Sequence, residues 1–433
     1  MSKWIALLTF CLSASLNAQI LIDHPLTLTE CVAFGLENQP ETKQVWWAAN
    51  RAASALGSAK SDYYPQLDLN LNASNGKLFE FGSVSHPFFS TAGANLTLSW
   101  LLYDFGGRDS LVEAAKSALL SANWQTNWVL QRVMVAILEN AYSLLHAYEV
   151  LQAAQISSQD AQLLLETAVQ LNRAGLAPVT DVYTGEATLA QMKMEAAMQQ
   201  AMIDVQRGKL AVSMGLPADA KIELAPLNDI PPPSLPCLSQ LIEMATELRA
   251  DLMAKRARVS ETIALQGQVR SSYLPQVSFT GIGGLDYAFG EKNDGGQYLV
   301  ALNLDFPLFT GFDASYQNRM AAADTNISLS DLAQLQLNIS LEVLTHSRTL
   351  AATQEMLQLA EISLNNSKMA YEGVLEKYRA GKERIAEVSN AQRQLAQARV
   401  RYSDIKTRML TSIANLAYAT GTLLPNMRDA CKN

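Results

Sequence analysis

Four short segments of the chain alternate apolar and polar residues with a period of two, which is the pattern of β-strands. They are centred on residues 65–74, 95–100, 277–282 and 300–306. Successive side chains of a strand point to opposite faces, so each segment has one apolar face and one face of Asp, Asn, Ser and Thr. The apolar positions are Leu67, Leu69, Leu71, Leu96, Leu98, Trp100, Val300, Leu302 and Leu304.

Long helical patterns fill most of the remaining chain. Neither proline nor glycine interrupts residues 108–173, and a second glycine-free run covers residues 313–372. At 1.5 Å per residue the first run predicts a helix roughly 100 Å long. Shorter helices are predicted over residues 26–37, 40–64, 238–248 and 250–274. The second and fourth of these end where a proline follows, because proline disfavours the α conformation of its predecessor.

The second half of the chain repeats the first. Tyr64-Pro65-Gln66 recurs as Leu274-Pro275-Gln276 at an offset of 210, and Arg173-Ala174-Gly175 recurs as Arg379-Ala380-Gly381 at an offset of 206. The halves therefore differ by four residues near the strands. Such a duplication predicts two copies of one structural unit. The predicted organisation is a signal peptide (1–18), a first repeat (19–216), a proline-rich linker (217–237), a second repeat (238–424) and a C-terminal tail (425–433).

A seven-residue period marks the helix that closes each repeat, and this period is typical of coiled-coil packing. The alternative interpretation is an ordinary amphipathic helix in a globular core. The heptad pattern continues for five heptads in each of the two helices, which favours coiled-coil packing over this alternative. Each repeat is thus predicted to end in a helical hairpin whose tip is the Arg-Ala-Gly turn. The heptad positions are Val182, Leu189, Ala196, Ile203 and Leu210 in the first repeat, and Val388, Leu395, Tyr402, Met409 and Leu416 in the second.

The N-terminus, up to Ala18, has the features of a secretory signal peptide: Lys3, a short apolar run, and a cleavage position before Gln19. Three cysteines would remain after cleavage, namely Cys31, Cys237 and Cys431. An odd count leaves at least one thiol unpaired or paired between chains, and whether any two form a disulfide is left open.

Composition excludes several classes of function. The 433 residues are 49% hydrophobic and carry a net charge of −8, which suits a large folded protein and gives no support for nucleic-acid binding. The four histidines do not lie near carboxylates or cysteines at ligand spacing, so no metal site is predicted. The motifs of nucleotide-binding loops, serine hydrolases and zinc proteases are missing, so neither a cofactor nor an enzymatic activity, such as that of a secreted enzyme, is expected.

The strand pattern bears on membrane insertion. No apolar run of about 18 residues follows the signal, so no transmembrane helix is expected. Strands of about ten residues with an apolar outer and a polar inner face are typical of membrane β-barrels. Four strands cannot close a barrel, and lipid tolerates no open sheet edge, so several chains would have to contribute. The alternative is a soluble two-layer structure in which helices pack on the sheet.

The chain resembles the TolC family of outer-membrane efflux and export channels. The motifs that carry the resemblance are the two Pro-Gln strand starts, Leu102-Tyr103-Asp104-Phe105-Gly106-Gly107, Pro307-Leu308-Phe309-Thr310-Gly311, Leu171-Asn172-Arg173-Ala174-Gly175 and Lys377-Tyr378-Arg379-Ala380-Gly381. The resemblance implies an α+β membrane protein: a homotrimer with a twelve-stranded barrel, four strands per chain, in the outer membrane of a Gram-negative bacterium. It implies a twelve-helix barrel that continues from this β-barrel into the periplasm.

The resemblance also implies a function and partners. The protein would be a passive channel-tunnel of a tripartite efflux or type I secretion system, joined by a periplasmic adaptor to an inner-membrane pump. Whether the pump is of the RND, ABC or MFS type is left open. The alternative function is a periplasmic coiled-coil adaptor, but an adaptor would have one hairpin and no duplicated lipid-facing strands. Arg173, Gly175, Arg379 and Gly381 would face the adaptor, although both glycines also suit a helix C-cap.

By resemblance, polar contacts near the tips close the periplasmic end of the tunnel. Asp181 and Tyr378 occupy positions that match such a contact, and Glu387 matches an acidic position in the constriction. Asn390 lies where relatives often carry a second acidic residue. Glu383 lies where the resemblance expects an arginine, so the gate salt bridge that this arginine would form is not implied for this chain. Surface charges near a turn are the alternative interpretation.

Overall fold

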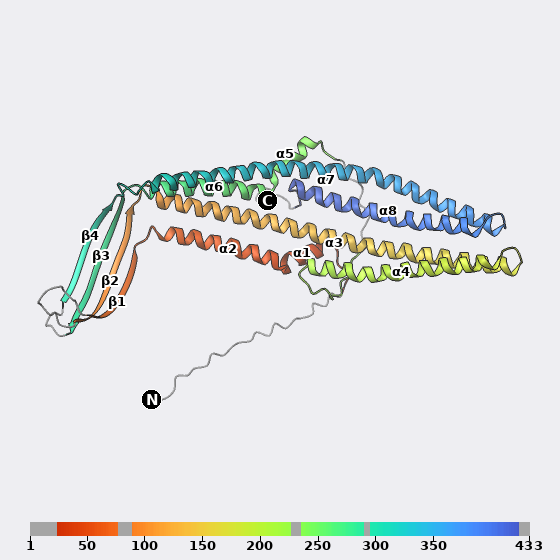
Figure 1. Ribbon diagram of the computed structural model, residues 1–433, viewed down its shortest axis with the longest axis horizontal. Coiled ribbons are helices and arrows are strands. Elements are labelled where there is room, and N and C mark those ends of the chain that lie inside the picture. The colour runs from red at the N-terminus through yellow and green to blue at the C-terminus, as the bar shows by residue number, and fades with distance from the viewer. Residues whose placement is uncertain (1–23, 77–88, 227–234, 290–294, 424–433) are drawn as a thin grey trace, which may run out of the picture.

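The computed structural model describes residues 24–76, 89–226, 235–289 and 295–423. The predicted signal peptide, the C-terminal tail and Cys431 lie outside these residues. The described chain forms an elongated body with a four-stranded sheet at one end and two helical hairpin tips at the other (Figure 1). In chain order the elements are α1 (Leu28–Asn38), α2 (Pro40–Ser61), β1 (Gln66–Gly76), β2 (Phe89–Tyr103), α3 (Gly107–Arg173), α4 (Val179–Ser213), α5 (Leu238–Leu248), α6 (Ala250–Ser271), β3 (Gln276–Phe289), β4 (Gly295–Asp305), α7 (Asp313–Arg379) and α8 (Ile385–Thr420).

The internal duplication is confirmed element by element. The long helices α3 and α7 both have 67 residues, α2 and α6 both have 22, and α1 and α5 both have 11. Equivalent helices before the strands start 210 residues apart, as the Pro-Gln motifs do. Equivalent helices after the strands start 206 residues apart, as the Arg-Ala-Gly turns do. The four-residue difference therefore falls within the β-hairpins, as the sequence offsets predicted.

The prediction for the ends of α2 and α6 was three residues too long. Both helices stop before the X-Pro-Gln motif, at Ser61 and Ser271. The next residues form a tighter turn, in which Tyr64 N donates to Ser61 O at 2.9 Å and Leu274 N donates to Ser271 O at 3.0 Å. This turn replaces the last helical turn because the α conformation is disfavoured for the residue before a proline.

The strands form one antiparallel sheet in the order β1-β2-β3-β4, so β2 and β3 join the two repeats. The register places Leu67 opposite Leu98, Leu98 opposite Gly281 and Phe279 opposite Leu302. All nine predicted apolar positions consequently lie on one face of the sheet, because paired residues share a face.

Between the third and fourth strands the sequence pattern predicted a loop over residues 283–296, which is too long at both ends, and residues 290–294 lie outside the described residues. β3 continues to Phe289 and β4 already begins at Gly295. Gly283 and Gly284, which the prediction assigned to the loop, pair with Tyr298 and Gln297 inside the ladder. Glycine has no side chain to oppose an extended conformation, so pairing with the neighbouring strand decides its structure here.

The soluble two-layer alternative is contradicted, because no helix covers the sheet in the described part of the chain. The strands make extensive contacts only with one another, and the sheet projects from the end of the helical body (Figure 1). Eight of the nine predicted apolar positions are well exposed in the single chain, and Leu98 is half-buried.

The helices form a single layer whose order changes along the body. Near the sheet the order is α2, α3, α6, α7, and towards the tips it is α4, α3, α8, α7 (Figure 1). The predicted heptads line the contacts of α4 and α8 within this layer, and none of their ten residues is exposed. The heptad positions of both hairpins therefore lie in helix–helix contacts, as predicted. No described helix is long and apolar enough to cross a membrane.

A buried arginine fixes the centre of the second repeat. Arg249 lies between α5 and α6, where its Nη2 and Nε pair with Asp251 and its Nη1 donates to Glu342 of α7 at 2.6 Å. The same Nη1 donates to the Ala419 carbonyl of α8 at 3.2 Å. The equivalent position of the first repeat is Gln39, whose uncharged side chain cannot form a comparable ion pair. Arg249 therefore fastens α7 and α8 to the short helices.

We expect Arg249→Ala to lower the free energy of unfolding by about 3 kcal/mol, because it leaves two carboxylates without their buried cation. Urea unfolding in detergent, followed by helical circular dichroism, measures the change. Arg256→Ala on the same helix is the control, since Arg256 is exposed and contacts the Met253 sulfur. Equal losses for both variants would contradict the role of the buried cluster.

Candidate functional site

Both hairpin tips use the same C-capping geometry. Gly175 and Gly381 have φ angles of +73° and +70°, and the residue after each glycine donates its N–H five residues back, with an N–O distance of 2.9 Å. This is the Schellman arrangement, which requires a residue that tolerates positive φ. A Cβ at either glycine would meet no atom within 4 Å, so the tips are open on their outer side. Arg173 and Arg379 are exposed beside these turns, and Arg379 pairs with Glu376.

The structure brings Tyr378 and Asp181 together, although they belong to different repeats. The Tyr378 hydroxyl donates to Asp181 Oδ2 at 3.0 Å. Tyr378 is the second-to-last residue of α7 and is only 2% exposed, among the apolar residues Leu164, Leu375 and Val388. Asp181 lies in the first turn of α4, where the helix dipole favours a negative charge. Burial, and then the hydrogen bond to Asp181, raise the pKa of Tyr378 above its usual value.

The other two predicted constriction residues do not join this contact within one chain. Glu387 is exposed in the first turn of α8, next to the buried Val388. Asn390 is half-buried, and its Oδ1 accepts a hydrogen bond from Arg393. Glu383, which stands where the resemblance expects an arginine, accepts from the Arg384 backbone N–H at 3.3 Å.

Sequence reasoning missed a row of polar contacts between α3 and α8. Arg399 Nη1 pairs with Asp160 Oδ2 at 2.9 Å, and Gln392 Nε2 donates to the Ser157 carbonyl at 3.1 Å. Ser403 Oγ donates to Glu149 at 2.7 Å. The partners come from opposite halves of the chain, so only the tertiary fold pairs them. The seven-residue spacing of Gln392 and Arg399 on α8 is the one sequence signal that could have suggested a seam.

Two atoms in this row have no partner among the described residues. Ser389 Oγ and Gln392 Oε1 are buried without a hydrogen bond. An unpaired buried polar atom costs free energy, which is recovered when water reaches it. The seam between the two hairpins thus combines polar contacts of modest strength with two atoms that separation would hydrate.

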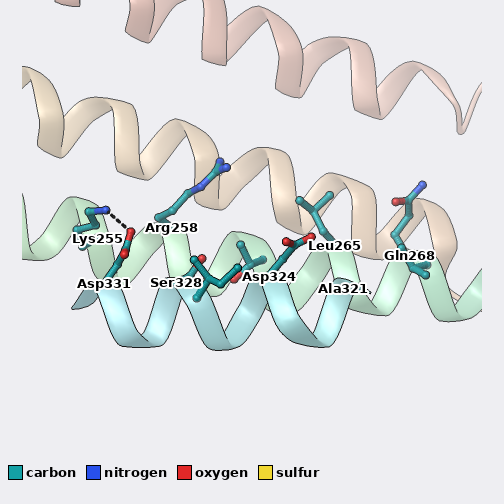
Figure 2. A pocket seen from close by; sticks show the side chains of 11 residues that line it. Lys255, Arg258, Leu265, Gln268, Ala321, Asp324, Ser328 and Asp331 are labelled. Atoms are coloured by element: carbon teal, nitrogen blue, oxygen red, sulfur yellow. Dashed lines mark hydrogen bonds and ion pairs between the residues drawn. The ribbon is translucent and has the colours of Figure 1, made fainter. Parts of the chain in front are cut away.

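A groove between α6 and α7 is polar on both sides. Figure 2 shows Lys255 bonded to Asp331 across it, at 3.0 Å, with Asp324 and Ser328 along the same face of α7. Arg258 on the α6 side pairs with Glu261. The lining is open and mixed in charge, unlike the enclosed apolar pockets that bind small molecules. Among the described residues there is also no cluster of three metal-ligating side chains. Cys31 and Cys237, the two described cysteines outside the signal, are unpaired.

Comparison with known proteins places these features in a family. The model of the outer membrane efflux protein family matches residues 35–216 and again residues 241–422. Protein CyaE of Bordetella pertussis is 24% identical over 410 residues, which cover 90% of this chain and 83% of the relative. Outer membrane protein TolC of Vibrio cholerae is 23% identical over 401 residues, which cover 89% of each chain.

Solved structures agree with this assignment of fold. The outer-membrane channel OprN superposes with a TM-score of 0.81 at 18% identity, over 91% of this chain and 90% of its own. The resemblance expected from the motifs is therefore confirmed, and so is the duplicated α+β channel fold.

The hydrogen bond of Tyr378 gives a pH-dependent prediction. We expect Tyr378→Phe to reduce the free energy of unfolding by about 1.5–3 kcal/mol, because the charged acceptor loses its donor while the ring still packs. The pKa of Tyr378 is raised in the folded protein. The hydrogen bond therefore contributes fully to the free energy of unfolding below pH 10, where an unperturbed tyrosine titrates, and this contribution declines as the pH rises further. Urea unfolding of both proteins at a series of pH values measures it. Tyr183→Phe, at an exposed position nearby, should change little at any pH.

Proposed function

The chain belongs to the outer membrane efflux protein family of export channels, and from this premise we propose that three copies form a passive tunnel from the periplasm through the outer membrane. One observation carries the proposal. A sheet with a continuous apolar face and two open edges stands at one end of a helical layer that also has two open edges.

The open edges of the sheet require further strands. β1 and β4 each have one side without a partner in the described chain. In hydrocarbon every backbone N–H and C=O must be paired, so β4 of one copy would pair with β1 of the next. Four strands are too few to enclose a lumen, whereas three copies supply twelve. The outward face would then contact lipid, and the polar face, with Asn70, Asn95 and Asn303, would line the tunnel.

The helical layer supports the same assembly. Its outermost members are α2 and α4 on the β1 side and α7 on the β4 side (Figure 1). α7 exposes apolar side chains at five positions of one heptad register, Met320, Ile327, Leu341, Ile362 and Met369, and polar Gln334, Arg348 and Glu355 occupy the positions between them. α4 exposes Met198, Val205 and Val212, also seven residues apart. Heptad rows are the surfaces through which helices pack side by side, so we infer that α7 of one copy packs against α2 and α4 of the next.

The tunnel has no energy source of its own, so the direction of transport must come from partners. We propose that the tips with Arg173, Gly175, Arg379 and Gly381 meet a periplasmic adaptor, which connects the tunnel to an inner-membrane pump. The helices would then lie in the periplasm, and the outer membrane would surround the sheet. Two features support this arrangement: the tips lie at the end farthest from the sheet, and their outer side is open.

The contact between Tyr378 and Asp181 is proposed as the gate. It joins α7 to α4 at the periplasmic end, and the row with Arg399 and Asp160 extends the same seam. Three copies of such a contact would keep the tunnel closed without locking it, since each charge-assisted bond is of modest strength. Glu387, exposed beside the gate, would form a ring of three carboxylates that attracts cations, with Asn390 as a neutral neighbour.

We expect the double variant Tyr378→Phe/Asp181→Ala to raise single-channel conductance in planar bilayers, because the closed state loses its link at three places. Glu387→Ala should reduce the preference for cations and weaken block by multivalent cations, because the carboxylate ring disappears. Tyr183→Phe serves as a control with an exposed hydroxyl. Wild-type conductance in the double variant, together with unchanged ion preference in Glu387→Ala, would place the gate elsewhere.

The two faces of β4 give a matched pair of variants. Leu302→Arg should cost roughly 2–4 kcal/mol near the bilayer midplane, because it places a charge in lipid. Asn303→Arg should be tolerated far better, since the proposed lumen contains water. The yield of trimer extracted from outer membranes, measured by light scattering in detergent, reports the difference. Equal loss at both positions would reject the proposed faces, and a monomeric product from the unmodified chain would reject the assembly.

A further inference from the structure

The offsets between the two repeats describe contacts as well as sequence. Gln66 of β1 pairs with Ser99 of β2 in the first repeat. In the second repeat Gln276, at the offset of 210 residues, pairs with Asp305, at the offset of 206 residues. Both β-hairpins thus keep the same register, so the offsets relate the two repeats contact by contact.

The internal junction between the repeats is formed by β2 with β3 and by α3 with α6 (Figure 1). The equivalent elements are β4 with β1 and α7 with α2, which lie at opposite edges of the chain and meet only when copies associate. In the internal junction Thr97 pairs with Ile282. The offsets convert this pair into Asn303 of one copy and Asn72 of the next, and both asparagines belong to the polar face of the sheet.

A close helix contact of the internal junction has a complementary pair at the outer edges. A Cβ at Gly267 of α6 would lie 2.9 Å from Ser110 Oγ of α3. The equivalent residues are Gly57 of α2 and Tyr316 of α7. Tyr316 is 61% exposed, and a Cβ at Gly57 would meet no atom within 4 Å. The bare backbone at Gly57 of one copy therefore leaves room for the larger Tyr316 side chain of the next.

The internal junction also places Glu261 of α6 close to Ala118 of α3. Ser121 Oγ donates to the Ala254 carbonyl at 3.0 Å, which fixes the relative level of these two antiparallel helices. Glu261 follows Ala254 by seven residues on the same face of α6, and its side chain is only 12% exposed. Ala118 precedes Ser121 by one turn of α3. At 1.5 Å per residue, the two positions are about 6 Å apart along the helix axes.

Two opposite charges occupy the equivalent positions at the outer edges. Arg51 of α2 corresponds to Glu261, and Asp324 of α7 corresponds to Ala118. Both are exposed, and neither forms an ion pair or a side-chain hydrogen bond with another described residue. Glu261 pairs with Arg258 of its own helix, whereas Arg51 has Ala48 at that position. The two charges are thus available to a neighbouring copy.

We propose that copies of this chain dock by repeating the internal junction, and that Arg51 of one copy forms an ion pair with Asp324 of the next. This inference rests on the proposed function. Helical side chains lean towards the N-terminus of their helix. Arg51 therefore leans away from the sheet and Asp324 leans towards it, so the two side chains approach each other across the gap of about 6 Å.

The ion pair gives the assembly a contact that the strands alone do not provide. A slip of one residue between β4 and β1 would put apolar side chains on the polar face, so it is disfavoured. A slip of two residues keeps both faces matched, because side chains alternate with a period of two. A fixed contact between the helices is therefore needed to select one register, and the pair of Arg51 with Asp324 supplies it.

Charge reversal tests the ion pair. Arg51→Asp and Asp324→Arg are compared with the double variant Arg51→Asp/Asp324→Arg, in which opposite charges face each other again. Each full-length channel is purified in detergent, and light scattering follows the temperature at which the trimer dissociates. Lys60→Asp is the matched control, because Lys60 is exposed on α2 nine residues from Arg51 and thus on the opposite side of the helix.

We expect each single reversal to lower the dissociation temperature by several degrees, because like charges then face each other between copies. The double variant should recover most of this loss, and Lys60→Asp should cause none. High salt should reduce the differences, since it screens charges at the surface. A double variant no more stable than the weaker single variant would overturn the proposed ion pair.

Disulfide formation tests the register independently of the charges. Asn72→Cys/Asn303→Cys should give a covalent trimer on oxidation, whereas Asn72→Cys/Asp305→Cys, displaced by two residues, should give little. Positions 72 and 303 lie on β1 and β4, about 14 Å apart within one chain, so their disulfide forms only between copies. The variants are made in a chain without the native cysteines Cys31, Cys237 and Cys431.

The outcomes separate this inference from the proposed function. A stronger link in the displaced pair, or no link in either pair of an intact trimer, would overturn the proposed register. A monomeric product from the unmodified chain would instead reject the assembly itself.

Discussion

A β-sheet cannot leave backbone N–H and C=O groups unpaired in hydrocarbon, and the organisation of this molecule follows from that constraint. Its four strands are joined through β2 and β3 but keep one unpaired side on β1 and one on β4 within the described chain. The helical layer has its free members on the same two sides, with α2 and α4 on one and α7 on the other. In the proposed assembly, a second copy would pair with the sheet edge and cover the exposed apolar residues of α7 in one docking geometry.

The helical body combines two kinds of contact with different consequences. Within each hairpin the heptad residues pack into apolar contacts. Between the hairpins, Leu164 and Ala168 of α3 pack against apolar residues of α7 and α8. Polar pairs are added to these apolar contacts, namely Arg399 with Asp160 and Tyr378 with Asp181. Polar groups regain hydrogen bonds to water when they separate, whereas apolar contacts resist separation.

The two repeats differ in single side-chain contacts at equivalent positions. Arg249 anchors α7 and α8 at the centre of the second repeat, where the first has Gln39. Arg108 clamps the strand-to-helix turn of the first repeat, where the second has Ala314. The second repeat thus has an extra ionic contact at its centre, whereas its strand-to-helix turn lacks the arginine contacts of the first. A duplicated fold permits this, because each copy keeps the common architecture while single contacts change.

The sequence by itself determined the local and repetitive features. Alternation located all four strands and their apolar face, the heptads identified the hairpin seams, and the repeated Arg-Ala-Gly turns located the tips. These signals depend on neighbours a few residues apart, so one sequence suffices to detect them. The match of Asp181 with Tyr378 came from resemblance, and their hydrogen bond was seen only in the folded chain.

Other features were decided by tertiary structure alone. Gly283 and Gly284 belong to a strand because β4 pairs with them, although the alternating pattern ended that strand at residue 282. The α3–α8 row joins residues from opposite halves, and no local pattern encodes which polar side chain meets which. Residues such as Asp160 and Arg399 look like ordinary charges on a helix surface until folding places them 2.9 Å apart. Burial and long-range pairing depend on where the whole chain places each side chain, so local sequence patterns did not reveal them.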